Sequence, residues 1–321
     1  LHYKIGNEWN VQEMDNILGN SYEGVINGLY NGMLIQYYLL AINSEGIIES
    51  FPTTAPQDNI MFILGELPSI YFTDFETNEI DWISGDESDN ASAGIWERAI
   101  PVGTYNDQGY QIQPDNDYSN PGEYCFITGN GNEDGNGGFD DVDNGKTTLY
   151  SPIFDLSSYE TVLLSYWYWY TNNIGDNGGN DIWNVSVSNN DGYSWTSIQN
   201  TSSSNTEWEK TQIILSDLVN LNEIIQFRFI AEDLAYNGDN GSGGSLVEAA
   251  IDNFNISNIS ENSGTIGDAN NDQQLNVLDV VIIVNMILGV EIENYATGDL
   301  NNDSQINVQD IVILINLILT I

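Results

Sequence analysis

The chain has 321 residues, which is enough for two or three domains. It has 48 Asp and Glu residues but only five Lys and Arg, which gives a formal net charge of −43. This balance argues against nucleic acid and anionic membranes as partners, because no basic surface exists to replace condensed counterions. It suits salty surroundings, or a protein that holds divalent cations.

Residues that carry catalysis are scarce. The single His, His2, and the single Cys, Cys125, offer no Ser-His-Asp or Cys-His arrangement, no His-based zinc site and no intrachain disulfide. Cys125 lies in a strand-like run and is read as an inert core thiol. Paired-carboxylate glycosidase chemistry stays open, since acids are abundant. We therefore expect that the chain is not an enzyme. One alternative is that it forms the accessory tail of a larger hydrolase.

Residues 1–66 read as β-strands. LHYKI at 1–5 alternates apolar and polar residues, and LIQYYLLAI at 34–42 is rich in aromatic and β-branched residues. The pattern from Tyr37 to Gly46 resembles the late strands of a fibronectin type III domain. The resemblance implies a partial sandwich in which LHYKI is a middle strand and the first one or two strands are missing. Either a piece cut from a longer protein or a sheet completed by another segment is therefore expected, with an unpaired edge or an opened apolar face beside LHYKI.

Residues 67–259 combine short aromatic strands with loops rich in Gly, Asn and Asp, which is typical of an antiparallel sandwich. Many stretches resemble a jelly-roll module of the MAM type, as appended to secreted bacterial hydrolases such as peptidases and zinc carboxypeptidases. These stretches are IYFTDFET, GIWERAIPVGT, QIQPDND, CFITGNG, DDVDNGKTTLYSPIFDLSSY, LLSYWYWYTNN, NDIWNVSVSNNDGYSWTSI and SLVEAAIDNFNIS. The resemblance implies a jelly-roll β-sandwich and says little about its ligand.

Acidic and aromatic residues of this region suggest two further features. The first and last strands of a jelly roll are often neighbours, so Glu76, Asp143, Glu248 and Asp252 are candidates for a second metal site. YWYWY at 166–170 alternates two aromatic faces on one strand. It is interpreted as a strand covered on both faces, by the core and by a neighbouring domain, with a sugar-stacking platform as the alternative.

A polar linker at 260–265 precedes an internal duplication at 266–321 with a period of 31 residues. Each copy places oxygen-bearing residues at positions 1, 3, 5, 7, 9 and 12 of a loop of about twelve residues, as calcium loops do. Position 7 contributes its backbone carbonyl. The predicted calcium ligands are Asp268, Asn270, Asp272, Gln274, Asn276 and Asp279 in the first copy, and Asp299, Asn301, Asp303, Gln305, Asn307 and Asp310 in the second.

An apolar helix is expected to begin near position 10 of each loop. The paired loop–helix units, GDxNxD followed by NxxD, resemble a dockerin domain rather than an EF-hand, whose loop would carry Gly at position 6 and Glu at position 12. Such domains bind cohesins partly through positions 10 and 11, which here are Val277, Leu278, Val308 and Gln309. The helices are apolar on every side, so their outer faces are expected to meet a partner.

The chain is thus expected to be mainly β, with a small all-α dockerin-like domain at its end. We expect an extracellular, secreted or cell-surface protein without a membrane span that binds two calcium ions in the dockerin-like domain and one or more in the jelly roll. Its expected task is adhesion or assembly with a cohesin-like or other protein partner, or with a second copy of itself. The alternatives are a tail that binds polysaccharide for a secreted hydrolase, and a subunit of an extracellular fibre.

Overall fold

The computed structural model of the chain describes residues 1–5, 8–26, 33–43, 45–64, 67–78, 81–131, 135–175, 178–234, 244–259, 267–270, 274–290, 295–301 and 305–320. The chain divides into two compact units. One is Ser69–Asn258, and the other combines Leu1–Pro68 with Ile259–Ile321. The expected linker at 260–265 lies outside the described residues.

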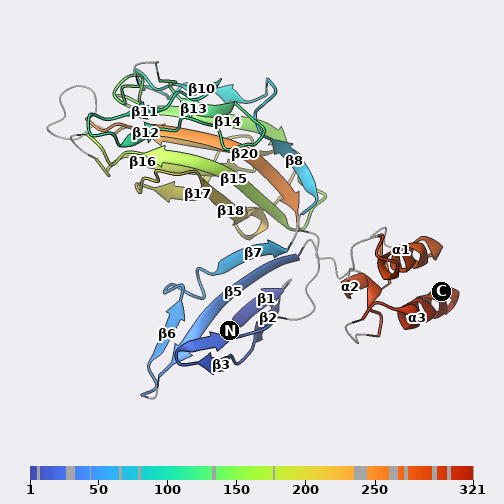
Figure 1. Cartoon of the computed structure of the whole chain (residues 1–321). Helices are drawn as coiled ribbons and strands as arrows, with labels where there is room; N and C mark the ends of the chain where they lie inside the picture. Colours follow the sequence, from blue (N-terminus) through green and yellow to red (C-terminus); the bar gives the residue numbers. More distant parts are fainter. Residues whose placement is uncertain are drawn as a thin grey trace. The chain divides into compact units, whose positions relative to one another are not determined.

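Residues before Pro68 form a twisted antiparallel sheet and a separate hairpin (Figure 1). The strands of this part are β1 His2–Ile5, β2 Glu8–Val11, β3 Asp15–Leu18, β4 Ser21–Glu23, β5 Met33–Ile42, β6 Ile48–Phe51 and β7 Ile60–Leu64. β1 pairs with β2 on one side and with β5 on the other. LHYKI is a middle strand, as expected, and its neighbour β2 is the edge strand of this sheet. β7 and β6 pair in turn with the first and second halves of β5.

The core of this sheet is thin. Among the described residues before Pro68, Ile35 is the one buried hydrophobic side chain, while Val11, Leu18, Ile42 and Phe51 are exposed. The alternating apolar residues therefore form strands here, but apolar side chains of the sheet remain exposed to solvent.

Ser69–Asn258 folds as two packed antiparallel sheets (Figure 1). The first has the order β10-β13-β20-β15-β18, with β8 also pairing with β20, and the second has the order β17-β16-β19-β14-β9. Its elements are β8 Ser69–Thr73, β9 Ile83–Ser84, β10 Trp96–Ala99, β11 Thr104–Tyr105, β12 Gln111–Gln113, β13 Cys125–Thr128, β14 Lys146–Phe154, β15 Val162–Thr171, β16 Ile182–Ser188, β17 Thr196–Thr201, β18 Glu209–Ile214, the 3₁₀ turn η1 Leu215–Asp217, β19 Ile225–Glu232 and β20 Glu248–Asn258.

The YWYWY stretch shows how the strand period builds this sandwich. Successive side chains of β15 point to opposite faces. Tyr166, Tyr168 and Tyr170 enter the core between the sheets, whereas Trp169 belongs to a smaller cluster on the outer face with Cys125. The buried Cys125 fits the expected inert thiol, since burial raises its pKa well above the usual value.

Loops of the same unit cover the outer face of β15. The Tyr118 ring stacks on Trp167 with centroids 3.6 Å apart, and the Trp169 indole N–H donates to the carbonyl of Ile112 at 2.8 Å. The expected double covering of the strand is therefore correct. The expected cover from a neighbouring domain is wrong, however. The outer face of the strand is covered by residues 112–118 of the same unit.

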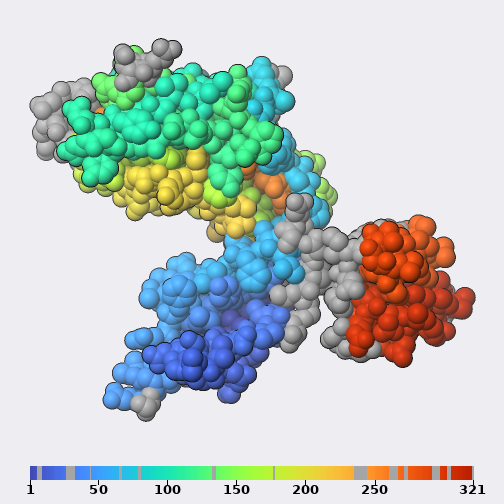
Figure 2. Space-filling view, in the orientation of Figure 1, coloured from blue at the N-terminus to red at the C-terminus, as the bar shows by residue number. Residues whose placement is uncertain are grey.

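The C-terminal residues form two helices, α1 Val277–Ile287 and α3 Val308–Thr320, with the single turn α2 Tyr295–Gly298 between them. α1 and α3 pack side by side as one body (Figure 2). Ile283 and Met286 from α1 meet Leu314 from α3 and Ile306 from the preceding loop in their shared core. None of the described helices is both long and apolar enough to cross a membrane.

The sandwich core supplies a first prediction. Phe254 is fully buried and its ring meets those of Phe227, Phe229 and Phe154. Phe254→Ala should lower the free energy of unfolding of this unit by about 3–5 kcal/mol, because it removes an aromatic side chain and leaves a cavity. Tyr193→Ala is the matched control, since Tyr193 is 90% exposed and its loss should change stability by less than about 0.5 kcal/mol. Denaturant unfolding followed by tryptophan fluorescence measures both, and equal effects would show that the core is not where we place it.

Candidate metal centres

The first loop of the duplication is closed by the carboxylate of Asp279. Its Oδ1 accepts hydrogen bonds from the backbone N–H groups of Ala269 at 2.9 Å and Asn270 at 3.2 Å, and its Oδ2 accepts from Asn276 at 2.8 Å. The Asn276 side chain in turn accepts from the N–H of Leu278. These bonds form a capping box at the start of α1, and they tie the first residues of the loop to the first turn of the helix.

The second loop repeats this arrangement. Asp310 Oδ1 accepts from the N–H groups of Leu300 at 2.9 Å and Asn301 at 3.3 Å, and its Oδ2 accepts from Asn307 at 2.8 Å. The Asn307 side chain accepts from the N–H of Gln309. Both helices begin at position 10 of their loops, as predicted. The duplication in the sequence is therefore also a duplication of the hydrogen-bond pattern.

The loops bury negative charge. Asp268, Asp279, Asp299 and Asp310 are all buried. No Lys, Arg or His follows Arg228 in the sequence. Buried charges are normally paired or bound to a metal. The buried carboxylates and the oxygen-only set of predicted donors fit a calcium ion in each loop.

Gly267 makes room for the entry to the first loop. Its φ is +99°, a conformation that favours glycine, and an added Cβ would lie 2.7 Å from the Leu314 side chain. Its N–H donates to the carbonyl of Thr297 at 2.9 Å, which links the first loop to the turn before the second. The two loops are thus held together by backbone bonding as well as by the helices.

Two of the predicted ligands, Asp272 and Asp303, lie outside the described residues. Within the described part of the chain, no three His, Cys, Asp or Glu side chains converge closely enough to hold a metal. The other ten predicted loop ligands lie in the described segments 267–270, 274–290, 295–301 and 305–320 and stay predictions.

The predicted partner-binding positions stand on the surface. Val277 is 68% exposed, Leu278 is 56% exposed and Val308 is 64% exposed, and Gln309 is also exposed. The expectation that these outer faces meet a partner stays a prediction. An apolar surface remains at the first turn of each helix.

The four jelly-roll acids fall into two groups. Glu76 Oε1 accepts from the N–H groups of Glu123 and Tyr124, both at 2.8 Å, and an added Cβ on Gly122 would lie close to both Glu76 and Asp117. Asp252 Oδ2 accepts from the N–H groups of residues 118 and 119. Burial raises the pKa of Asp252 to about 7, and the charge of Asp117 adds to this shift. Glu76, Asp117 and Asp252 thus share one end of the sheet.

Glu248 and Asp143 belong to a different neighbourhood. Burial raises the pKa of Glu248 well above its usual value, and the charge of Asp141 adds to the shift. Burial likewise raises the pKa of Asp141 to about 8, and the charge of Asp143 adds to this shift. No sequence motif marks Asp117, because it lies near Asp252 only after segments far apart in the chain come together.

Residues 266–319 match the family Dockerin type I domain, so this part of the chain is a dockerin type I domain. Dockerin type I domains bind calcium. The match covers the duplicated loops and both helices, and so confirms the resemblance drawn from the loop spacing. No curated protein matches the chain.

Solved structures with partial similarity are β-sandwich modules. They include TmCBM61 in complex with beta-1,4-galactotriose, at 14% identity over 56% of this chain and 90% of that chain, with a TM-score of 0.32. The K1 cleaved adhesin domain of Lys-gingipain from Porphyromonas gingivalis W83 has 13% identity over 59% and 97%, with a TM-score of 0.34. A xylan-binding domain from CBM 22 has 8% identity over 60% and 96%, with a TM-score of 0.33. Similarity at this level assigns no ligand to this chain.

Calcium removal gives the second prediction. A chelator should unfold α1 and α3, because the buried carboxylates of the two loops would then repel one another without a counter-charge. Asp279→Ala should weaken calcium binding in the first loop and lower helical content at limiting calcium, since it removes a ligand and the three hydrogen bonds that close the loop. Val312→Ala, at an exposed position of α3, is the control and should change neither. Far-ultraviolet circular dichroism during a calcium titration measures both, and full helicity in chelator would contradict a structural role for the metal.

Proposed function

We propose that this chain is a non-catalytic region of a larger extracellular protein, and that its dockerin domain anchors it to a cohesin-type partner when calcium is bound. The observation that carries the proposal is the dockerin match at 266–319 together with the repeated, exposed first turns of α1 and α3. Two calcium ions would hold the loops, one in each copy, and so present these turns to the partner.

The chemistry of the exposed turns indicates the character of this contact. Val277, Leu278 and Val308 are apolar where hydroxylated residues are frequent in dockerins, and only Gln309 is polar. Burying such side chains releases water without a need for matching charges. The contact should therefore depend on apolar complementarity and respond weakly to salt once calcium is bound.

The two β regions would then serve as spacers and accessory modules. We read the sheet of β1, β2, β5, β6 and β7 as part of a fibronectin type III-like sandwich, and the unit Ser69–Asn258 as a MAM-like jelly roll. The domain limits would be 1–66, 67–259 and 266–321, with adhesion or assembly as the task of the whole.

A second reading is a tail that targets polysaccharide. Its support is the half-exposed aromatic group of Tyr118, Trp167 and Trp208 on the outer face of the first sheet. Aromatic side chains of this kind stack on apolar faces of other rings. The same face of Trp167 is already occupied by Tyr118, which is why protein-mediated anchoring is preferred here.

A pair of substitutions tests the anchoring function and is the third prediction. Leu278→Asp combined with Val308→Asp should abolish binding to cohesin domains of the source organism, because each places a charge in a contact that must become dry. Leu319→Asp, which changes another exposed apolar residue near the end of α3, is the control. Biolayer interferometry on immobilised cohesin domains, with calcium present, measures the affinity. If the native chain bound none of these domains, or if the double variant bound as well as native, cohesin anchoring through these turns would be wrong.

A further inference from the structure

A cavity of about 420 Å³ lies between the β11–β12 hairpin and the segment that follows β15. Asn106, Gln108 and Tyr110 line it from the hairpin, and residues 173–175 line it from the other segment. This volume falls within the range of about 300–1,000 Å³ that is usual for small-molecule sites. The cavity is therefore large enough for a small ligand, and its lining indicates which kind.

The hairpin wall of this cavity is fixed by its own hydrogen bonds. Oδ1 of Asn106 accepts from the backbone N–H groups of Gln108 at 3.0 Å and of Tyr110 at 2.9 Å. The N–H of Asn106 donates to the carbonyl of Tyr110 at 2.9 Å, and the N–H of Gly109 donates to the carbonyl of Asn106 at 2.9 Å. An Asn side chain that bonds the backbone in this way holds a turn in one shape. The side chains of Gln108 and Tyr110 thus project from a fixed backbone.

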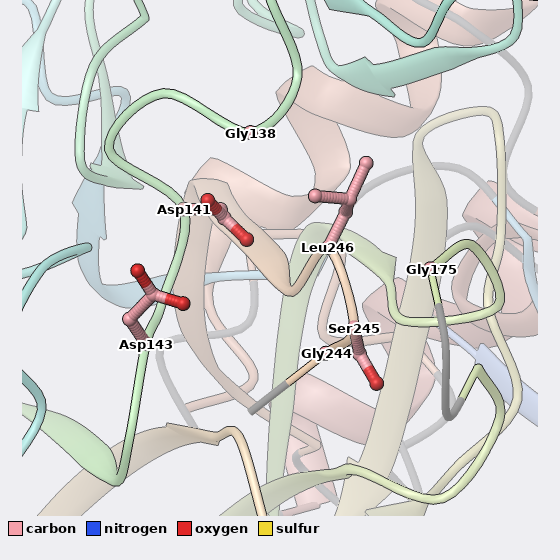
Figure 3. Close-up of a pocket in the computed structure, with 7 residues that line it drawn as sticks. All are labelled: Gly138, Asp141, Asp143, Gly175, Gly244, Ser245 and Leu246. Atoms are coloured by element: carbon pink, nitrogen blue, oxygen red, sulfur yellow. The ribbon is translucent and has the colours of Figure 1, made fainter. Parts of the chain in front are cut away.

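The other wall is fixed to the segment before β20. The N–H of Leu246 donates to the carbonyl of Ile174 at 2.8 Å, and Gly175 pairs with Ser245. Figure 3, which looks into a neighbouring cavity, shows Gly175 near Gly244 and Ser245. The φ of Gly175 is +109°, and an added Cβ would lie 2.1 Å from the carbonyl oxygen of Gly244. Glycine therefore allows the close approach of the two backbones that holds this wall in place.

One backbone carbonyl joins the two walls. The Trp169 indole N–H donates to the carbonyl of Ile112 at 2.8 Å, and the Thr171 hydroxyl donates to the same carbonyl at 2.9 Å. Ile112 belongs to β12 of the hairpin, whereas Trp169 and Thr171 lie at the end of β15, just before residues 173–175. All three residues are buried. The cavity is thus formed before a ligand arrives, which lowers the cost of binding.

The lining offers hydrogen-bonding groups without charge. Asn106, Gln108 and Asn173 carry amides, Tyr110 carries a phenol, and Ile174 is the one aliphatic side chain in this lining. The hydrogen bonds of the described residues engage Oδ1 of Asn106, but neither the Gln108 amide nor the Tyr110 hydroxyl. An amide donates through its nitrogen and accepts through its oxygen, so it can pair with a hydroxyl in either sense. The side chain of Tyr110 is 62% exposed and offers the face of its ring to a ligand.

We propose that this cavity binds a neutral sugar unit of a polysaccharide or oligosaccharide, with the Tyr110 ring against the sugar ring and the amides of Gln108 and Asn173 on its hydroxyls. A sugar ring has C–H groups on its faces and hydroxyls at its rim, so it matches both the aromatic and the amide parts of the lining. Acidic sugars are disfavoured, because the lining has no basic side chain and the net charge of the chain is −43. A peptide fits less well, because peptide sites use a free strand edge or an apolar groove and this lining is mainly polar.

The site adds a glycan contact to the anchoring function and does not rest on it. It shares no residue with the aromatic group of Tyr118, Trp167 and Trp208, so the two places can be tested separately. The unit Ser69–Asn258 would bind the glycan, while the dockerin domain would bind the cohesin-type partner.

The test measures sugar binding by the full chain in calcium and is the fourth prediction. Isothermal titration with neutral gluco-, xylo-, manno- and galacto-oligosaccharides as probes should show binding of at least one of them. Tyr110→Ala should weaken its affinity about tenfold, because the stacking face is lost, whereas Tyr110→Phe keeps the ring and should weaken it less. Gln108→Ala should weaken it several-fold through the lost hydrogen bonds. Tyr193→Ala, at an exposed aromatic residue outside the cavity, is the control and should bind as native.

Two results would overturn the proposal. One is that native protein binds none of the neutral probes at millimolar concentration. The other is native affinity in Tyr110→Ala, and loss of binding in Trp208→Ala alone would then place the sugar on the other aromatic group. Both substituted side chains of the cavity are exposed, so their variants should fold as native. The double variant Leu278→Asp and Val308→Asp should bind sugar as native, so a failure of cohesin binding with sugar binding intact would count against the anchoring function alone.

Discussion

Burial of carboxylates is the constraint on which this structure depends. It acts in the paired loops of the dockerin domain and in the sandwich, where Asp141, Glu248 and Asp252 are buried. A net charge of −43 leaves too few Lys and Arg residues to balance them. Divalent cations are the remaining counter-charge, so the fold of this protein is expected to follow the calcium concentration around it.

This dependence links the environment to function. In the dockerin domain, the same aspartates that would bind the ion also close the loop onto the first turn of the helix. The exposed apolar residues at positions 10 and 11 lie on that turn. Losing the ion would therefore disturb the surface that a partner would bind. The chain would then bind its partner only where the calcium concentration is high.

The sequence was informative where the chemistry is local. The ligands of each loop lie within about twelve residues, so their spacing alone predicted the loops, the start of both helices and the family. The alternation of YWYWY likewise predicted a strand covered on both sides. The sandwich acids could not be grouped in this way, because Asp141 and Glu248 are brought together only by the hydrogen bond between the backbones of Val142 and Val247, far apart in the sequence. For the same reason the sequence could not show that residues 112–118 would cover Trp167 and Trp169.

The measurement that tests the central claim most directly is amide hydrogen exchange in the dockerin loops at fixed pH, with calcium and with chelator. The informative amides are those of Ala269, Asn270, Leu300 and Asn301, which donate to the buried carboxylates of Asp279 and Asp310. The account predicts strong protection of all four in calcium and its loss in chelator. Equal protection of the four amides in chelator would contradict it, because the loops would then close without a cation to balance their buried charge.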